Sequence, residues 1–179
     1  MLVVNLFGSP GSGKSTGAAY IFSKLKLAGI NAELVTEFAK DMVWEENHTA
    51  FENQAYIFGE QCYRVSRLRE KVDVVVTDSP ILLSSFYNTD PAYAAELDSL
   101  VTKVFHIYDN YNVFINRVKP YNPSGRIHTE QESNQIVEDL LQFLASHGVV
   151  CKPYDGSIEG YDSLVKDILI ELKGRGLDV

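Results

Sequence analysis

The chain has 179 residues, of which 45% are apolar and 22% are charged, an ordinary composition for a globular protein with its own core. Its formal net charge of −8 excludes the broadly basic surface of proteins that coat nucleic acid or anionic membranes. No apolar stretch approaches the roughly 18 residues of a membrane span, so no membrane partner is expected. Length and composition predict a single domain over residues 1–179.

The first apolar run and the two cysteines favour a cytoplasmic location. Residues 2–7 are too short for the apolar core of a signal peptide and lead directly into a glycine-rich segment. Cys62 and Cys151 lie far apart and match no metal or redox spacing, so reduced, buried thiols are expected.

The first strand, loop and helix carry the most specific motif. Residues 2–16 read LVVNLFGSPGSGKST, in which Gly8 to Ser15 match G-x-x-x-x-G-K-[ST] at each fixed position. Glycines let backbone N–H groups approach phosphate oxygens, and the following helix points its positive dipole at the same anion. We expect Lys14 to reach the β- and γ-phosphates of ATP, and the Ser15 hydroxyl to bind Mg²⁺. The predicted nucleotide-binding residues are Gly8, Ser9, Pro10, Gly11, Ser12, Gly13, Lys14, Ser15 and Thr16.

Apolar periodicity predicts a helix over residues 14–28, which Gly29 would cap, and a second strand over residues 30–36. Residues 38–50 show no clear period and are expected to form a loop or a short helix over the site. From Phe51, apolar residues recur at spacings of four and three, which predicts one long amphipathic helix. Its apolar stripe is Phe51, Ala55, Phe58, Cys62, Val65 and Leu68.

The rest of the chain continues to alternate between strands and helices. Strands are predicted over residues 72–77, 111–118 and 149–154, and helices over 81–88, 93–106, 129–147 and 161–173. The third of these helices begins with T-E-Q-E, which resembles a capping box. This order predicts an α/β protein with a three-layer P-loop NTPase fold, a five-stranded parallel sheet and a ligand at the carboxyl ends of the strands.

Two of the predicted strands end in an acid. Asp78 follows an apolar strand, an arrangement that places a carboxylate near Mg²⁺, although a turn or helix-capping aspartate gives the same pattern. Glu37 closes the second strand, so in a parallel sheet it is expected to face the same crevice. There it would accept or position the proton of an attacking hydroxyl, unless it is simply an exposed acid; Asp41 is a weaker candidate for this role.

Side chains on the long helix and nearby aromatic residues are candidates for contacts with an acceptor. Gln54, Gln61 and Arg64 lie at helical spacing and would either hydrogen-bond an acceptor or point into solvent. A few of the aromatic residues are expected to stack on a base, while most belong to the core. The aromatic candidates are Phe38, Trp44, Tyr56, Phe58, Phe86, Tyr87 and Tyr121.

A lid is predicted around residues 118–128. Arg117 and Arg126 flank the segment R-V-K-P-Y-N-P-S-G-R, whose prolines and glycine indicate a loop. Guanidinium groups on a lid neutralise charge on a transferring phosphoryl group and help exclude water, with Lys119 in an assisting position. Solvated loop charges are the alternative. The candidate catalytic residues are Glu37, Asp78, Arg117 and Arg126, and the candidate metal ligands are Ser15 and Asp78.

Three motifs together resemble a group of small phage-type P-loop proteins. They are T-E-F-A-K-D at 36–41, V-D-V-V-V-T-D-S-P at 72–80 and R-V-K-P-Y-N-P-S-G-R at 117–126, and the likeness extends to about Leu172. The group is similar to the nicotinamide riboside kinase domain of a bacterial NAD regulator and, more distantly, to thymidylate and nucleoside kinases. Some members of the wider phage group phosphorylate the hydroxymethyl group of 5-hydroxymethyluracil within DNA.

The resemblance implies an ATP-dependent kinase that contributes to the synthesis of hypermodified bases. It makes Lys14 and Ser15 the ATP·Mg²⁺ clamp and Asp78 and Glu37 the metal-side and hydroxyl-side carboxylates, without deciding which of the two is the base. Arg117 and Arg126 become the lid arginines.

The predicted acceptor is nucleoside-like, with 5-hydroxymethyluracil in DNA as the most specific hypothesis. A nicotinamide riboside kinase or another nucleoside or nucleotide kinase is the nearest alternative. A regulatory nucleotide-binding ATPase is the alternative from a different class. The absence of an N-K-x-D-like segment disfavours a guanine-specific switch.

Overall fold

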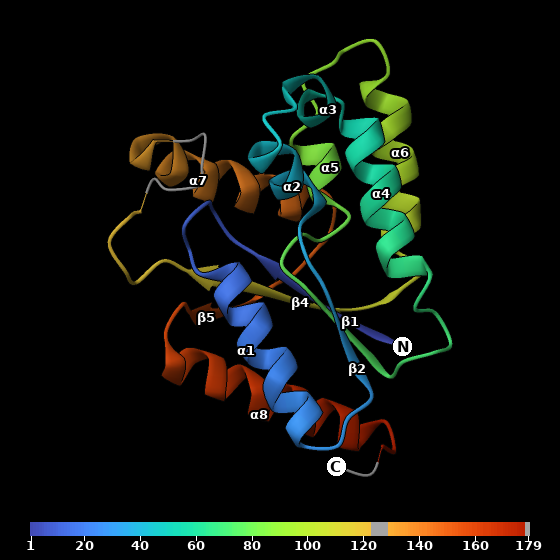
Figure 1. Cartoon of the computed structure of the whole chain (residues 1–179), viewed down its shortest axis with the longest axis vertical. Coiled ribbons are helices and arrows are strands. Elements are labelled where there is room, and N and C mark those ends of the chain that lie inside the picture. Colours follow the sequence, from blue (N-terminus) through green and yellow to red (C-terminus); the bar gives the residue numbers. More distant parts are fainter. Residues whose placement is uncertain (123–128, 178–179) are drawn as a thin grey trace.

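The computed structural model describes residues 1–122 and 129–177. Within these ranges, five strands form one parallel sheet in the order β2-β3-β1-β4-β5, with helices on both faces (Figure 1). The strands are β1 (Leu2–Phe7), β2 (Ala32–Val35), β3 (Val74–Thr77), β4 (Asp109–Asn116) and β5 (Lys152–Asp155). The predicted α/β fold, with three layers and five parallel strands, is confirmed.

The central strand β1 explains why both faces of the sheet are covered. It lies between β3 and β4, with Leu2 in register with Val74 of β3. Successive side chains of a strand point to opposite faces. Leu2, Val4 and Leu6 therefore pack into a core with α1 and α8, whereas Phe7 packs into the core on the other face.

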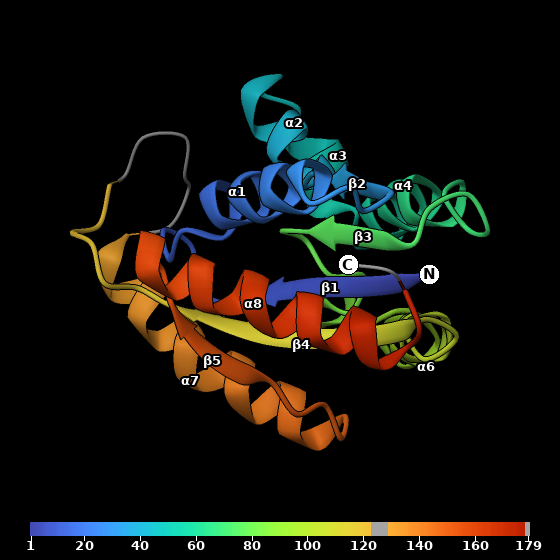
Figure 2. The ribbon, with the colours of Figure 1, turned by 90° about the horizontal axis from the view of Figure 1, so that it is seen from below.

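The helices divide between the two faces in the same way. Figure 2 shows α8 and α7 on either side of β5. The first face carries α1 (Lys14–Leu27) and α8 (Ile158–Gly174), and the second carries α4 (Gln54–Ser66), α5 (Leu83–Phe86), α6 (Ala94–Phe105) and α7 (Glu130–Ser146). Because every strand is parallel, all carboxyl ends meet at one edge of the sheet, where the predicted site residues follow the strands.

The segment after β2 was predicted as a loop or short helix over residues 38–50 followed by one long helix from Phe51, and the structure differs at the start of that long helix. The segment forms α2 (Phe38–Trp44) and α3 (His48–Glu52), and α4 begins only after Asn53. Asn53 has non-helical backbone angles, and its side chain accepts a hydrogen bond from the N–H of Tyr56, which fixes a new helix start there. The start predicted at Phe51 is therefore wrong.

The buried face of α4 is also rotated from the predicted stripe. Ala55 is exposed, whereas Gln54, Ile57 and Gln61 are buried together with Phe58 and Val65. Two polar side chains therefore take the inward positions of a 3.6-residue period. For Gln54 and Gln61, the alternative of a solvent-exposed side chain is wrong.

Other boundaries shift by a few residues. β4 ends at Asn116, so Arg117 belongs to the following loop, and β5 begins only at Lys152, after the exposed Val150. The capping box at Thr129 is confirmed at the start of α7. No helix within the described ranges is both long enough and apolar enough to cross a membrane.

Candidate functional site

The loop between β1 and α1 has the backbone of a phosphate cradle. Gly8 and Gly13 have φ angles of 144° and 102°, in the region that favours glycine. A Cβ on Gly8 would lie 2.8 Å from both the Ile115 carbonyl oxygen and Ser12 Oγ, so the loop also packs too closely for a side chain there. Gly13 is the N-cap of α1, which directs the positive end of that helix into the loop.

Two side chains of the loop are suited to an anion. Lys14 Nζ donates to the carbonyl oxygens of Gly8 and Ser9, at 2.8 and 3.1 Å, which holds the ammonium group over the loop. Ser12 Oγ is buried and has no hydrogen-bond partner among the described residues. A buried hydroxyl without a partner is unfavourable by about 1–3 kcal/mol, so a phosphate oxygen that accepted its hydrogen bond would relieve that energy.

The last helix supports this loop from behind. Tyr161 Oη donates to the carbonyl oxygen of Gly13 at 2.9 Å, and the Tyr161 ring packs so closely that a Cβ on Gly17 would lie 2.6 Å from it. Gly156, in the turn after β5, lies against the Ser12 carbonyl, where a Cβ would come within 2.2 Å. The position of the loop therefore depends on residues near the other end of the chain.

The two acidic strand ends meet beside the loop. The backbone N–H of Glu37 donates to Asp78 Oδ1 at 3.0 Å, and the Asp78 side chain is only 3% exposed. Asp78 does not cap α5, whose N-cap is Leu82 and has no side-chain cap. Asp78 therefore fixes the end of β2 relative to the end of β3.

Glu37 is partly buried and lies within the electrostatic reach of both Lys14 and Asp78. Burial raises the pKa of the Glu37 carboxyl, the positive charge of Lys14 opposes the shift, and the negative charge of Asp78 adds to it. The net direction is upward, which brings the pKa closer to neutral pH. The structure thus brings Lys14, Glu37 and Asp78 together, as their positions after parallel strands predict.

Gln61 holds the backbone on either side of Glu37. This side chain is 1% exposed; its Oε1 accepts from the N–H of Phe38 at 3.1 Å, and its Nε2 donates to the Thr36 carbonyl at 3.4 Å. Nε2 also lies 3.5 Å from Thr77 Oγ1 on β3. Sequence reasoning missed this role, although the helical spacing of Gln61 from the buried Ile57 was a usable signal.

Neighbouring candidates on the acceptor side have specific partners. Arg64 Nη2 bonds to Asp41 Oδ2 at 2.9 Å, and its guanidinium lies 4.9 Å from the centre of the Phe38 ring. Burial and the negative charge of Glu37 raise the pKa of the Tyr87 phenol, which places this side chain close to Glu37. Tyr87 was predicted only as a stacking candidate, so its electrostatic coupling to Glu37 was missed.

Arg117 docks on the first turn of α7. Its Nη2 donates to Asn134 Oδ1 and lies 3.3 Å from Glu130 Oε1, and the guanidinium lies 5.3 Å from the centre of the Tyr121 ring. Arg117 Nη1 is buried, and no residue within the described ranges accepts a hydrogen bond from it. Arg126 and residues 123–128 of the predicted lid lie outside the described residues.

The same turn of α7 also contacts the phosphate loop. Ser133 Oγ donates to the carbonyl oxygen of Pro10 at 2.7 Å, and Ser133 is fully buried. The beginning of α7 therefore joins Arg117 to the loop, a link that no local sequence pattern predicts.

The comparison with protein families agrees with this geometry. A model of the AAA domain family matches residues 3–160, a range that includes the phosphate loop, Glu37, Asp78 and Arg117. The chain belongs to this AAA domain family. It is therefore a nucleotide-binding protein with a P-loop NTPase fold, and such proteins typically bind ATP with Mg²⁺. A comparison with curated proteins found no match.

Proposed function

We propose that this AAA-family protein is an ATP-dependent kinase that transfers the γ-phosphate to a hydroxyl of a nucleoside-like acceptor. The observation that carries the proposal is the position of Glu37: a partly buried carboxylate, fixed through its backbone by Asp78, next to the lysine of the phosphate loop. A carboxylate whose pKa is raised accepts a proton more readily than an ordinary glutamate does.

The residues of the loop fit a nucleotide triphosphate with its metal. Lys14 and the loop N–H groups would hold the phosphates, and the Ser15 hydroxyl and the Asp78 carboxylate would hold Mg²⁺. The orphaned hydroxyl of Ser12 supports this assignment, because it lies within the cradle and lacks an acceptor among the described residues. Bound ATP supplies the phosphoryl group that is transferred.

On the acceptor side, Glu37 would take the proton of the attacking hydroxyl, and Gln61 keeps its backbone in place. Arg117 would balance negative charge near the transferred phosphoryl group. Its buried Nη1 supports this role, because no described residue accepts a hydrogen bond from it. We include Arg126 as the second arginine of a lid over residues 118–128, on the basis of the sequence motif. The whole chain, residues 1–179, would then act as one kinase domain.

For the acceptor, we propose 5-hydroxymethyluracil in DNA, which the sequence motifs favour. A nicotinamide riboside, nucleoside or nucleotide kinase uses the same arrangement of groups with a smaller acceptor. A regulatory ATPase would use Glu37 to orient water instead of an acceptor hydroxyl. A cytoplasmic location, including a host cytoplasm for a phage-encoded chain, agrees with this chemistry.

The test is transfer of radiolabelled γ-phosphate from ATP to three acceptors in parallel: DNA containing 5-hydroxymethyluracil, free nucleosides, and nicotinamide riboside. Label in the DNA that is lost in Lys14→Ala supports both the reaction and the acceptor. Lys26→Ala, in the exposed last turn of the same helix, is the matched control and should keep full activity. Label only in a nucleoside or in nicotinamide riboside would keep the kinase reaction but replace DNA as the acceptor. Steady release of phosphate without transfer would support the regulatory ATPase.

A further inference from the structure

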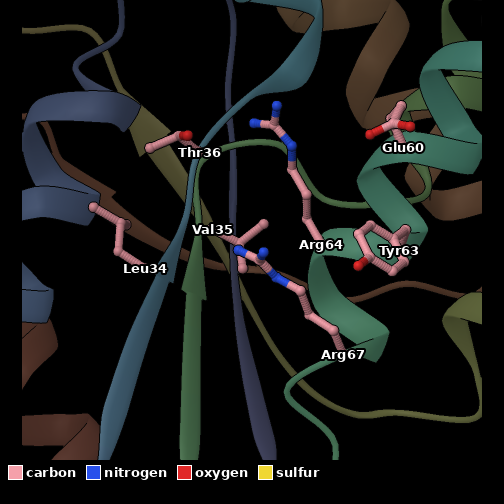
Figure 3. A pocket seen from close by; sticks show the side chains of 7 residues that line it. All are labelled: Leu34, Val35, Thr36, Glu60, Tyr63, Arg64 and Arg67. Carbon is pink, nitrogen blue, oxygen red and sulfur yellow. The ribbon is translucent and has the colours of Figure 1, made fainter.

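A cavity of about 290 Å³ lies between the edge strand β2 and helix α4 (Figure 3). The lining residues are Leu34 and Val35 of β2 with the following Thr36, and Glu60, Tyr63 and Arg64 of α4 with its C-cap residue Arg67. Thr36 directly precedes Glu37, so the cavity adjoins the proposed acceptor side of the site. Of the lining residues, only Arg64 was considered above as a candidate for hydrogen-bonding an acceptor.

The cavity is lined by two arginines in a chain whose net charge is −8. Figure 3 shows Arg64 and Arg67 extending from α4 toward β2. Arg67 is exposed, and its guanidinium has no ion-pair or hydrogen-bond partner among the described residues, whereas Arg64 is held by Asp41 and the Phe38 ring. Glu60 is the one acid among the lining residues.

The other lining groups suit a polar, partly aromatic ligand. Tyr63 is 60% exposed, so one face of its ring is available for stacking on a base or packing on a sugar. Thr36 is exposed at the end of β2 and offers a hydroxyl. The N–H of Leu34 is already bonded to Glu33 Oε1 at 3.1 Å, which leaves arginine side chains as the principal donors.

We propose that this cavity binds a phosphate group carried by the acceptor, with Arg67 as its principal ligand and Arg64 as a second. Arginine recognises phosphate through several N–H donors in one plane. The volume is at the lower end of ligand pockets, so it fits a phosphate and part of a sugar while the acceptor hydroxyl extends toward Glu37. The acceptor is therefore a phosphorylated nucleoside, either a free nucleotide or a nucleotide within a strand.

This inference rests on the proposed kinase function, but binding can be measured without transfer. The probes are thymidine, thymidine 5′-monophosphate and a short fluorescent single-stranded oligothymidylate, titrated against the full chain. The variant is Arg67→Gln, because replacing Arg64 would also break its contacts with Asp41 and Phe38. Arg69→Gln is the matched control: it removes the same charge from the next part of the chain, where Arg69 lies over the Tyr108 ring outside the cavity.

We expect Arg67→Gln to weaken binding of the phosphorylated probes about tenfold, to leave thymidine binding unchanged, and to differ clearly from Arg69→Gln. A tenfold effect on the monophosphate indicates a free nucleotide as acceptor, and an effect confined to the oligonucleotide indicates a strand. Equal effects of Arg67→Gln and Arg69→Gln, or an Arg67→Gln variant that binds both the monophosphate and the oligonucleotide as tightly as wild type, would overturn the proposal.

The same variants separate this inference from the kinase proposal. If Arg67→Gln lowers binding of phosphorylated probes but no acceptor receives label, the phosphate subsite stands and the kinase function fails. If label is transferred and Arg67→Gln slows transfer to nucleosides and nucleotides equally, the kinase function stands and the subsite fails.

Discussion

The nucleotide half of the site and the acceptor half are built in different ways. The phosphate loop depends on glycine backbone conformations and on close packing against Tyr161 and Gly156, with side-chain hydrogen bonds from α7 and α8 to its carbonyl groups. The ends of β2 and β3 are held by side-chain hydrogen bonds: Asp78 accepts from the N–H of Glu37, and Gln61 bonds to the backbone on either side of it. A side chain that holds the acceptor half can therefore be replaced without changing the glycine conformations on which the phosphate loop depends.

This difference predicts where substitutions affect binding and where they affect chemistry. A change in the loop disturbs the nucleotide in any reaction that this AAA-family chain performs. A change around Glu37 leaves the loop intact and alters what happens to the acceptor. Three substitutions, with matched controls, test this separation.

Glu37→Gln should have the largest effect. It removes the proposed base while keeping its size, so we expect the turnover number for transfer to fall by about 10²–10³-fold with little change in nucleotide affinity. Glu45→Gln, the same substitution at the exposed C-cap of α2, is the matched control and should leave turnover unchanged. Steady-state kinetics with equilibrium nucleotide binding measures both quantities. An equal loss in the two variants would remove Glu37 from its proposed role.

The raised pKa of Glu37 has a consequence for pH. The wild-type carboxyl binds its proton more tightly when folded, so its contribution to stability is full below the ordinary pKa and is lost as pH rises through the raised value. Glu37→Gln should therefore unfold at a higher urea concentration than wild type at neutral pH. The acid limb of the wild-type rate profile should lie above the ordinary glutamate value of 4.5. A less stable Glu37→Gln protein would contradict the shift.

Gln61→Leu should have a smaller, mixed effect. The substitution leaves the N–H of Phe38 and the carbonyl of Thr36 without their partner, which lowers the free energy of unfolding by about 1–3 kcal/mol. Turnover should fall severalfold because Glu37 lies between these two groups, while nucleotide affinity stays the same. Gln142→Leu, on the exposed side of α7, is the control and should lie within about 0.5 kcal/mol of wild type. A weaker affinity for nucleotide in Gln61→Leu would show that the two halves are coupled.

The parts of the site that the sequence predicts are those with a local pattern. The phosphate loop is one contiguous motif, and Asp78 and Glu37 could be placed together because the ends of parallel strands meet. Alternating strands and helices likewise predict the five-stranded sheet. The start of α4 was missed because the apolar pattern continues through Phe51, although Asn53 is a common N-cap residue.

The parts that could not be predicted depend on contacts between distant segments. Ser133 reaches Pro10 across 123 residues, and Tyr161 reaches Gly13 across 148. Whether Gln61 points inward depends on the rotation of α4, which only packing against the sheet decides. Periodicity identifies an amphipathic helix, but a buried glutamine counts as a polar residue in that pattern and so indicates the wrong face.

Gly17→Ala tests the packing of the nucleotide half, and Gly59→Ala tests the same change in the acceptor half. Alanine normally stabilises a helix interior relative to glycine by about 0.5–1 kcal/mol, and Gly59 of α4 has open space, so Gly59→Ala should stabilise by that amount. At Gly17 the new methyl group would lie 2.6 Å from the Tyr161 ring, which is buried and bonded to Gly13, so we expect a loss of about 1–3 kcal/mol. Urea unfolding measures both. If Gly17→Ala and Gly59→Ala are both more stable than wild type, the Tyr161 ring must move aside without cost. Close packing would then not distinguish the phosphate loop from the acceptor half.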